Sequence, residues 1–164
     1  MNQASLVLQR LPARTGELWV GHGAAEALRG AGCRIPDLLR FTIHDGAVLA
    51  RIAARQFLRL GAGEVIAPPS VLRLSHPCAE FSLAGAQARA LLAEVASASM
   101  DECGLDAWFP TRVCSLDAVV HRMGDDWRIV CSPAEEPWLG EALAARVHAR
   151  GGLVDAANTP RIHD

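Results

Sequence analysis

Ser75, His76 and Cys78 are the residues whose types could form a nucleophile and its base. A hydroxyl or thiol becomes a good nucleophile when a histidine within hydrogen-bond distance takes its proton and a third group orients that histidine. No such third group stands at a defined spacing, and Pro77 is a residue type that ends strands. We therefore interpret this segment as a structural turn after a strand, and we predict no catalytic residue in the chain.

Asp101, Glu102 and Asp106 form a small acidic cluster. Paired carboxylates can act as acid and base when burial separates their pKa values. These three lie in a segment that contains Gly104 and carries no strong periodicity, which favours a solvated loop.

Two aromatic residues, Trp108 and Phe109, follow this loop, with Arg112 shortly after them. Aromatic side chains in such a position either anchor the core or form the centre of a protein interface, and both roles stay open here. Trp108, Phe109 and Arg112 are our candidates for a partner-binding surface.

Neither the histidines nor the glycines form a recognisable ligand-binding motif. The 6 histidines are scattered without HxH or HExxH spacing, and the 5 cysteines form no CxxC pair. The glycine-rich stretches at 21–23 and 61–63 do not make GxGxxG. We predict no metal site and no cofactor site in this chain, and we expect the cysteines to be small buried residues.

The charge and composition exclude several classes of function. The net charge is −2, so no basic excess is available for nucleic acid. All 16 basic residues are arginine, which excludes Schiff-base chemistry on a lysine. No apolar run approaches the roughly 20 residues that span a bilayer, and residues 1–5 do not resemble the start of a signal peptide. We expect a cytoplasmic protein that binds neither membrane nor nucleic acid.

Hydrophobic periodicity and turn residues place the elements along the chain. Strands are predicted at 5–11, 47–53, 56–60, 64–67, 71–75, 79–84, 113–123 and 127–131. Helices are predicted at 24–29, one turn at 37–40, 86–96, and from a Ser132 N-cap with a capping box at Glu135 to stops at Gly151 and Gly152.

This order of elements predicts an α+β fold in which helices pack on an antiparallel sheet. We expect one domain, with residues 1–46 as an N-terminal arm and short helices, 47–155 as the core, and 156–164 as a loose tail.

From about residue 47 the sequence resembles a known family, the small gamma subunit of heterotetrameric sarcosine oxidase and of related N-methyl amino acid dehydrogenases. That family is similar to part of the aminomethyltransferase (glycine-cleavage T-protein) fold. The stretches that carry the likeness are 48–52 (VLARI) with 56–60 (QFLRL), 74–76 (LSH) with 81–92 (FSLAGAQARALL), 109–112 (FPTR), and 119–122 (VVHR) with 127–130 (WRIV) and 138–139 (WL).

Three positions depart from the family pattern. Ala53-Ala54 stands where the family has a Gly-Pro corner, and Arg73 stands where an acidic residue is common. The glycine-containing insert between Pro110 and Thr111 is missing.

The resemblance implies an aminomethyltransferase-like fold and an accessory role. The partners would be larger flavoprotein alpha and beta subunits, which would carry FAD, FMN, NAD and tetrahydrofolate and oxidise an N-methylated amine. The alternative is a stand-alone tetrahydrofolate-binding one-carbon transfer protein. Its pterin pocket would need aromatic side chains and a carboxylate, for which Trp108, Phe109, Asp101 and Arg112 are the clustered candidates.

Overall fold

The structure is a computed structural model that describes residues 6–61 and 65–155. These residues group into two compact units, each of which is built from segments that are far apart in the sequence. Unit 1 contains residues 6–13, 79–105 and 110–155, and unit 2 contains residues 14–61, 65–78 and 106–109. Strands, three α-helices and a short 3₁₀ helix make up the described elements, so the predicted α+β class is confirmed.

This grouping does not follow the predicted boundary at residue 46, because β2 (Arg14–Val20) lies between two strands of unit 2. The two units group residues by their contacts and do not test whether residues 1–46 form a separate arm, so the division into 1–46 and 47–155 stays a prediction. The predicted loose tail at 156–164 lies outside the described residues.

Unit 2 contains an antiparallel sheet in the order β3-β4-β5-β2-β6. Its strands are β2, β3 (Phe41–His44), β4 (Ala47–Ala53), β5 (Gln56–Leu60) and the first half of β6 (Leu72–Ala84). The predicted strands at 47–53 and 56–60 are confirmed at both ends. They form a hairpin whose turn includes Ala54 and Arg55.

The helix α1 (Ala24–Gly30) packs against one face of this sheet, where apolar side chains alternate along the strands. Trp19 on β2, Leu49 on β4 and Phe57 on β5 meet Leu28 of the helix in one buried cluster. The remaining buried members of this cluster are Ala24, Cys33, Val65 and Val71.

Unit 1 contains the second half of β6, which lies between β1 (Val7–Arg10) and β9 (Asp126–Cys131) and is antiparallel to both. Next to β9 come β8 (Leu116–Met123) and β7 (Phe109–Val113), and β10 (Leu153–Val154) pairs parallel with β1. The predicted β8–β9 hairpin is confirmed, with Gly124 and Asp125 in its turn.

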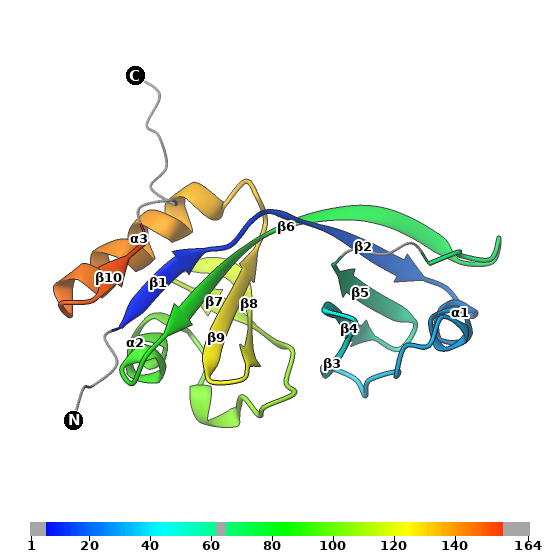
Figure 1. Cartoon of the computed structure of the whole chain (residues 1–164), viewed down its shortest axis with the longest axis horizontal. Coiled ribbons are helices and arrows are strands. Elements are labelled where there is room, and N and C mark those ends of the chain that lie inside the picture. Colours follow the sequence, from blue (N-terminus) through cyan, green and yellow to red (C-terminus); the bar gives the residue numbers. More distant parts are fainter. Residues whose placement is uncertain (1–5, 62–64, 156–164) are drawn as a thin grey trace, which may run out of the picture. The chain divides into compact units, whose positions relative to one another are not determined.

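Two helices cover the sheet of unit 1, as Figure 1 shows. In α3 (Glu136–Ala149) the buried side chains Leu139, Leu143 and Val147 recur at helical spacing. α3 contacts β1 and β10, and α2 (Ala88–Val95) contacts β9. A short 3₁₀ helix, Met100–Glu102, also contacts α2.

The predicted chain break at Pro77 is wrong, because β6 runs through it without interruption. The Glu80 carbonyl accepts a hydrogen bond from the Leu11 N–H at 2.8 Å, which places the backbone groups of Glu80 on the side of β1 and β2. Neighbouring residues of a strand direct these groups to opposite edges. Those of Pro77 therefore face the other edge, where the missing N–H costs no bond to β2.

Three further element predictions are wrong. Residues 113–123 are not one strand, because Cys114 and Ser115 form a tight turn between β7 and β8. Residues 65–67 form no strand, since Val65 instead contributes to the α1 cluster, and residue 64 lies outside the described residues. The segment 37–40 is a turn with Leu39 at a φ of 56°, so it is not helical.

The start of α3 also differs from the prediction. Ser132 does not cap the helix: its hydroxyl accepts a hydrogen bond from the Ala134 N–H at 3.2 Å within a turn that precedes Glu136. The predicted stop at Gly151 is confirmed, with a φ of 69° that suits glycine. Among the described residues, no helix combines the length and apolar character that crossing a bilayer requires.

Candidate functional site

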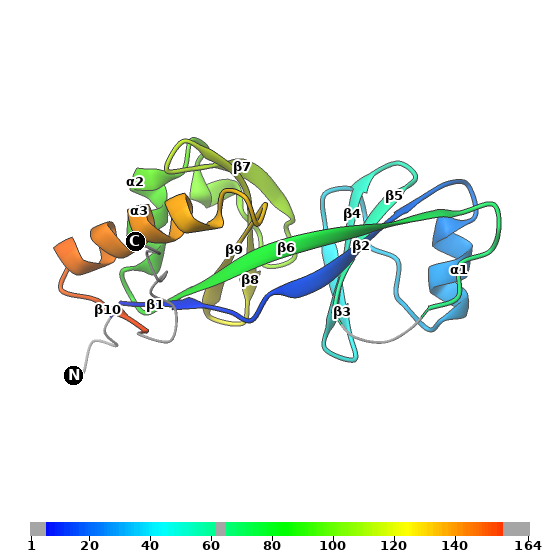
Figure 2. The same ribbon diagram turned by 90° about the horizontal axis from the view of Figure 1, so that it is seen from above.

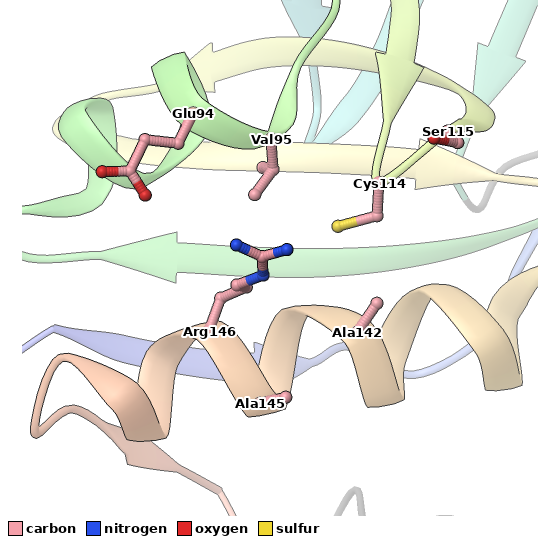
Figure 3. Close-up of a pocket in the computed structure, with 7 residues that line it drawn as sticks. All are labelled: Glu94, Val95, Cys114, Ser115, Ala142, Ala145 and Arg146. Carbon is pink, nitrogen blue, oxygen red and sulfur yellow. The ribbon is translucent and has the colours of Figure 1, made fainter.

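A pocket of about 430 Å³ lies within unit 1, between the end of α2, the β7–β8 turn and the middle of α3 (Figure 3). Ala142 and Ala145 of α3 contribute only methyl groups, which leaves the space open. The other lining residues are Glu94 and Val95 of α2, Cys114 and Ser115 of the turn, and Arg146 of α3.

The β7–β8 turn presents two polar side chains to this pocket in a backbone conformation that is rare for them. Cys114 has a φ of 52° and Ser115 a φ of 70°, the left-handed region that two-residue hairpin turns usually fill with Asn or Gly. The Cys114 N–H donates to the Val95 carbonyl at 2.9 Å, and the Ser97 N–H donates to the Arg112 carbonyl at 2.8 Å. The end of α2 and the residues after it therefore hold the turn in place.

The thiol of Cys114 is half-buried in this pocket. Burial raises the pKa of the Cys114 thiol, and the positive charge of Arg146 opposes part of that rise. Because the thiolate is the nucleophilic form, the raised pKa keeps this cysteine in its weakly reactive thiol form at neutral pH.

Two arginines, one within α3 and one at its C-terminus, supply the positive charge at this site. Arg150 forms an ion pair and a hydrogen bond with Glu94. This bond and the Arg150 charge hold the pKa of the Glu94 carboxyl below its ordinary value. Arg146 points its guanidinium between α2 and the turn, as Figure 3 shows.

The lining residues include groups that can bind an anion. The Arg146 guanidinium and the Ser115 hydroxyl can hydrogen-bond an anionic group. The carboxylate of Glu94 is held ionised by Arg150, and the thiol of Cys114 is held neutral. In the described part of the chain, no group of three or more His, Cys, Asp or Glu residues is placed to hold a metal ion.

The residues considered first for nucleophilic chemistry lie in the extended strand β6, so the predicted turn at 75–77 is wrong. Adjacent strand residues point to opposite faces of a sheet, which separates the side chain of Ser75 from that of His76. The Cys78 thiol donates to the His76 carbonyl oxygen at 3.4 Å.

The three interface candidates differ in exposure. Trp108 is only 2% exposed, so of its two possible roles it fills the core role. Phe109 is half-buried. Arg112 has a 64% exposed side chain, and its Nε donates to Asp117 Oδ1 at 3.1 Å.

Two acidic residues of the predicted loop have arginine partners. Asp106 accepts a hydrogen bond from Arg40 at 2.9 Å, and Asp101 is bonded to Arg89. Arg112 is bonded to Asp117, so both the carboxylate and the guanidinium considered for a pterin pocket already have a partner within the chain. None of the four residues considered for that pocket lines the pocket described above.

Sequence reasoning missed the pocket residues Cys114, Ser115 and Arg146. Cys-Ser lacks the glycine or asparagine that marks a hairpin turn, and Arg146 has the pattern of one more exposed helix position. The remaining signal in the sequence was weak: the polar Ser115 lies close to the apolar residues Val113 and Leu116.

No protein-family model and no curated protein matches this sequence. Solved structures do match the fold. A chain of the heterotetrameric sarcosine oxidase from Corynebacterium sp. U-96, solved in complex with pyrrole 2-carboxylate, superposes with a TM-score of 0.74 at 14% identity. The match covers 95% of this chain and 90% of that chain.

The aminomethyltransferase T of the glycine cleavage system from Bartonella henselae superposes with a TM-score of 0.66 at 19% identity. That match covers 93% of this chain and 48% of the other, so this chain spans about half the length of the aminomethyltransferase. The chain thus has a fold similar to aminomethyltransferase-like proteins, and the resemblance stated from the sequence is confirmed at the level of fold.

Proposed function

We propose that this chain is a non-catalytic structural subunit of a multi-subunit, flavin-dependent oxidase or dehydrogenase that acts on N-methylated amines. One observation carries the proposal: the fold similarity extends over nearly the whole length of both this chain and a chain of a heterotetrameric sarcosine oxidase. A match to a fragment of a larger enzyme would not distinguish an accessory chain from a catalytic domain.

The comparison with the aminomethyltransferase supports the same role. This chain corresponds to about half of that protein, since the match covers 48% of it. Under the proposal, the larger alpha and beta subunits carry FAD, FMN, NAD and tetrahydrofolate, and this chain contributes folded surface to them in the cytoplasm. The pocket in unit 1 is consistent with this division of labour, because burial raises the pKa of its thiol and so disfavours the nucleophilic thiolate.

The experiment that tests the proposal is affinity capture of the tagged chain from the organism that encodes it. We expect larger chains to co-elute with flavin absorbance, and the eluate to oxidise sarcosine or another N-methylated amine. The same tag on an unrelated protein serves as the control for adventitious flavoproteins.

The isolated chain, expressed without partners, provides the second arm of the test. We expect it to fold and to show no turnover of N-methylated amines with or without added flavin. Elution of the tagged chain by itself at its own mass, or turnover by the isolated chain, would contradict the proposal.

A further inference from the structure

The first half of β6 has one edge that no other strand of the described chain occupies. Residues 72–78 pair with β2 on one side, whereas the partner on the opposite side, β9, begins to pair only at Ala79. Figures 1 and 2 both show this part of β6 running beside β2. All six residues from 72 to 77 are exposed, and we call their unoccupied side the open edge.

The backbone of the open edge presents specific hydrogen-bonding groups. Because Glu80 directs its groups towards β1 and β2, the alternation of the strand directs those of Arg73, Ser75 and Pro77 to the other side. The open edge therefore offers the N–H groups of Arg73 and Ser75 and the carbonyls of all three residues. An extended polypeptide segment has the complementary set of groups at the matching spacing.

The side chains along the open edge give the two faces of the strand a different chemical character. Leu72 and Leu74 point to one face and are 56% and 44% exposed, which is unusual for alternate leucines of a strand. Arg73 points to the other face, where its Nη1 lies 3.6 Å from Glu17 Oε1 and donates to the Val65 carbonyl.

We propose that an extended strand of a partner subunit adds to the sheet of unit 2 at this open edge. The added strand would be apolar on the face that it shares with Leu72 and Leu74, and acidic where it meets Arg73. This inference rests on the proposed function, because it assigns a place on the chain to the partner subunit.

The charge of the segment favours a different chain over a second copy of this one. Arg73 shares the single carboxylate of Glu17 with Arg59, so these three side chains together carry one more positive than negative charge. Two copies paired edge to edge would bring two such groups together, and residues 72–78 supply no further carboxylate. A different chain can supply that carboxylate. Pro77, which has no N–H, ends the pairing at one side and limits the added strand to residues 72–76.

The sharpest variant is Ser75→Pro, with Ser75→Ala as its matched control. Both remove the exposed hydroxyl, but only the proline removes the N–H that faces the open edge, and its ring occupies the position of an added strand. The bonds to β2 come from the alternate residues, so we expect both variants to fold. Capture of partner chains by Ser75→Pro should weaken about tenfold or more, whereas Ser75→Ala should match the wild type.

Hydrogen exchange gives an independent readout on the unaltered protein. In the captured complex, the amides of Arg73 and Ser75 should exchange about tenfold or more slowly than in the isolated chain. The already paired amides of β4 serve as the internal reference.

A second pair of variants covers the case in which Ser75→Pro does not fold, as judged by circular dichroism. Leu74→Glu places a charge on the open edge, and Leu38→Glu places the same charge at another exposed leucine of unit 2, which is 55% exposed. Leu74→Glu should weaken partner capture about tenfold or more, and Leu38→Glu should not.

Each remaining outcome overturns a stated claim. Equal capture by the proline or glutamate variants and their controls, with unchanged exchange at residues 73 and 75, would overturn the open edge as the site while leaving the proposed function intact. If the isolated chain forms a homodimer and Ser75→Pro makes it monomeric, the edge binds a second copy of this chain, and the proposal is overturned. Capture of no partner by the wild type would overturn the proposed function and this inference together.

Discussion

The two halves of strand β6 have the same backbone conformation and opposite environments. The half that begins at Ala79 is buried, pairs with strands on both edges and contributes Phe81 and Leu83 to the core of unit 1. The half that ends at Cys78 pairs on one edge only, and its residues 72–77 are exposed. Both halves carry leucine, so composition alone does not account for the difference.

This difference shows that the extended conformation of a segment and its burial have separate causes. Backbone pairing with β2 is enough to keep residues 72–78 extended, even with Pro77 among them. Burial requires packing against further elements, and in the described structure residues 78–83 are the buried ones. A long, exposed strand edge that carries exposed leucines is a feature that monomeric proteins usually cover or block. The exposed half is therefore the part of β6 where a partner strand could form new hydrogen bonds and bury exposed leucines.

The largest effect that separates the two halves is expected for truncation of a leucine in each. Leu83 is fully buried, so Leu83→Ala should lower the free energy of unfolding by about 2–5 kcal/mol through lost burial and a residual cavity. Leu74→Ala should lower it by about 1 kcal/mol or less, because Leu74 is already 44% exposed to water in the folded chain. Urea unfolding followed by circular dichroism measures both. Equal losses would show that Leu74 is packed in the free chain, contrary to the comparison.

A smaller effect tests how closely β2 approaches the exposed half of β6. A Cβ atom at Gly16 would lie 2.4 Å from the His76 carbonyl oxygen, and backbone atoms cannot move aside cheaply. Gly16→Ala should therefore destabilise the protein by about 1–3 kcal/mol.

Gly30, the last residue of α1, provides the matched control for this substitution. A Cβ atom at Gly30 would meet only open space, so Gly30→Ala should be neutral or stabilising by up to roughly 1 kcal/mol. Thermal unfolding of the two variants side by side measures the contrast. A neutral Gly16→Ala would mean that β2 and β6 separate easily, which would weaken the case for a preformed edge.

Sequence patterns predicted those elements whose ends are determined by neighbouring residues in the sequence. The strands at 47–53 and 56–60 have their observed bounds, since their apolar residues and the corner between them are adjacent in the sequence. The turn at Cys114 and Ser115 was missed because neither residue usually adopts the left-handed backbone conformation of a two-residue hairpin turn. Its left-handed backbone is held by a contact with Val95, which is distant in the sequence.

The candidate sites were harder to predict because they depend on non-local pairing. Pro77 ends a strand in most contexts, and only the position of β2 shows that its nitrogen faces an unoccupied edge. Trp108 could have been a core or an interface residue by type, and the fold around it decides for the core. The pocket brings together residues from Glu94 to Arg146, which no spacing rule connects.

The smallest expected effect concerns Cys114. Of the five cysteines, Cys114 is half-buried and the other four are buried. Alkylation by iodoacetamide, read at Cys114 by mass spectrometry, should be slow at neutral pH and should rise only at a pH above that of an ordinary thiol, because burial raises its pKa. Arg146→Gln should move the midpoint of this rate profile to still higher pH, since the Arg146 charge favours the thiolate. Arg89→Gln removes an arginine that is paired with Asp101 and should leave the midpoint in place.

The sign of the accompanying stability change follows from the same pKa. A thiol whose pKa is higher in the folded than in the unfolded chain contributes its stabilisation below the unfolded pKa and loses it as the pH rises through the folded value. Removal of the thiol by Cys114→Ser should therefore flatten the alkaline limb of the stability profile. A rate midpoint for Cys114 at or below that of a free thiol would show that the pocket activates this cysteine, and would point to a chemical role for unit 1 beside the structural role that we propose for unit 2.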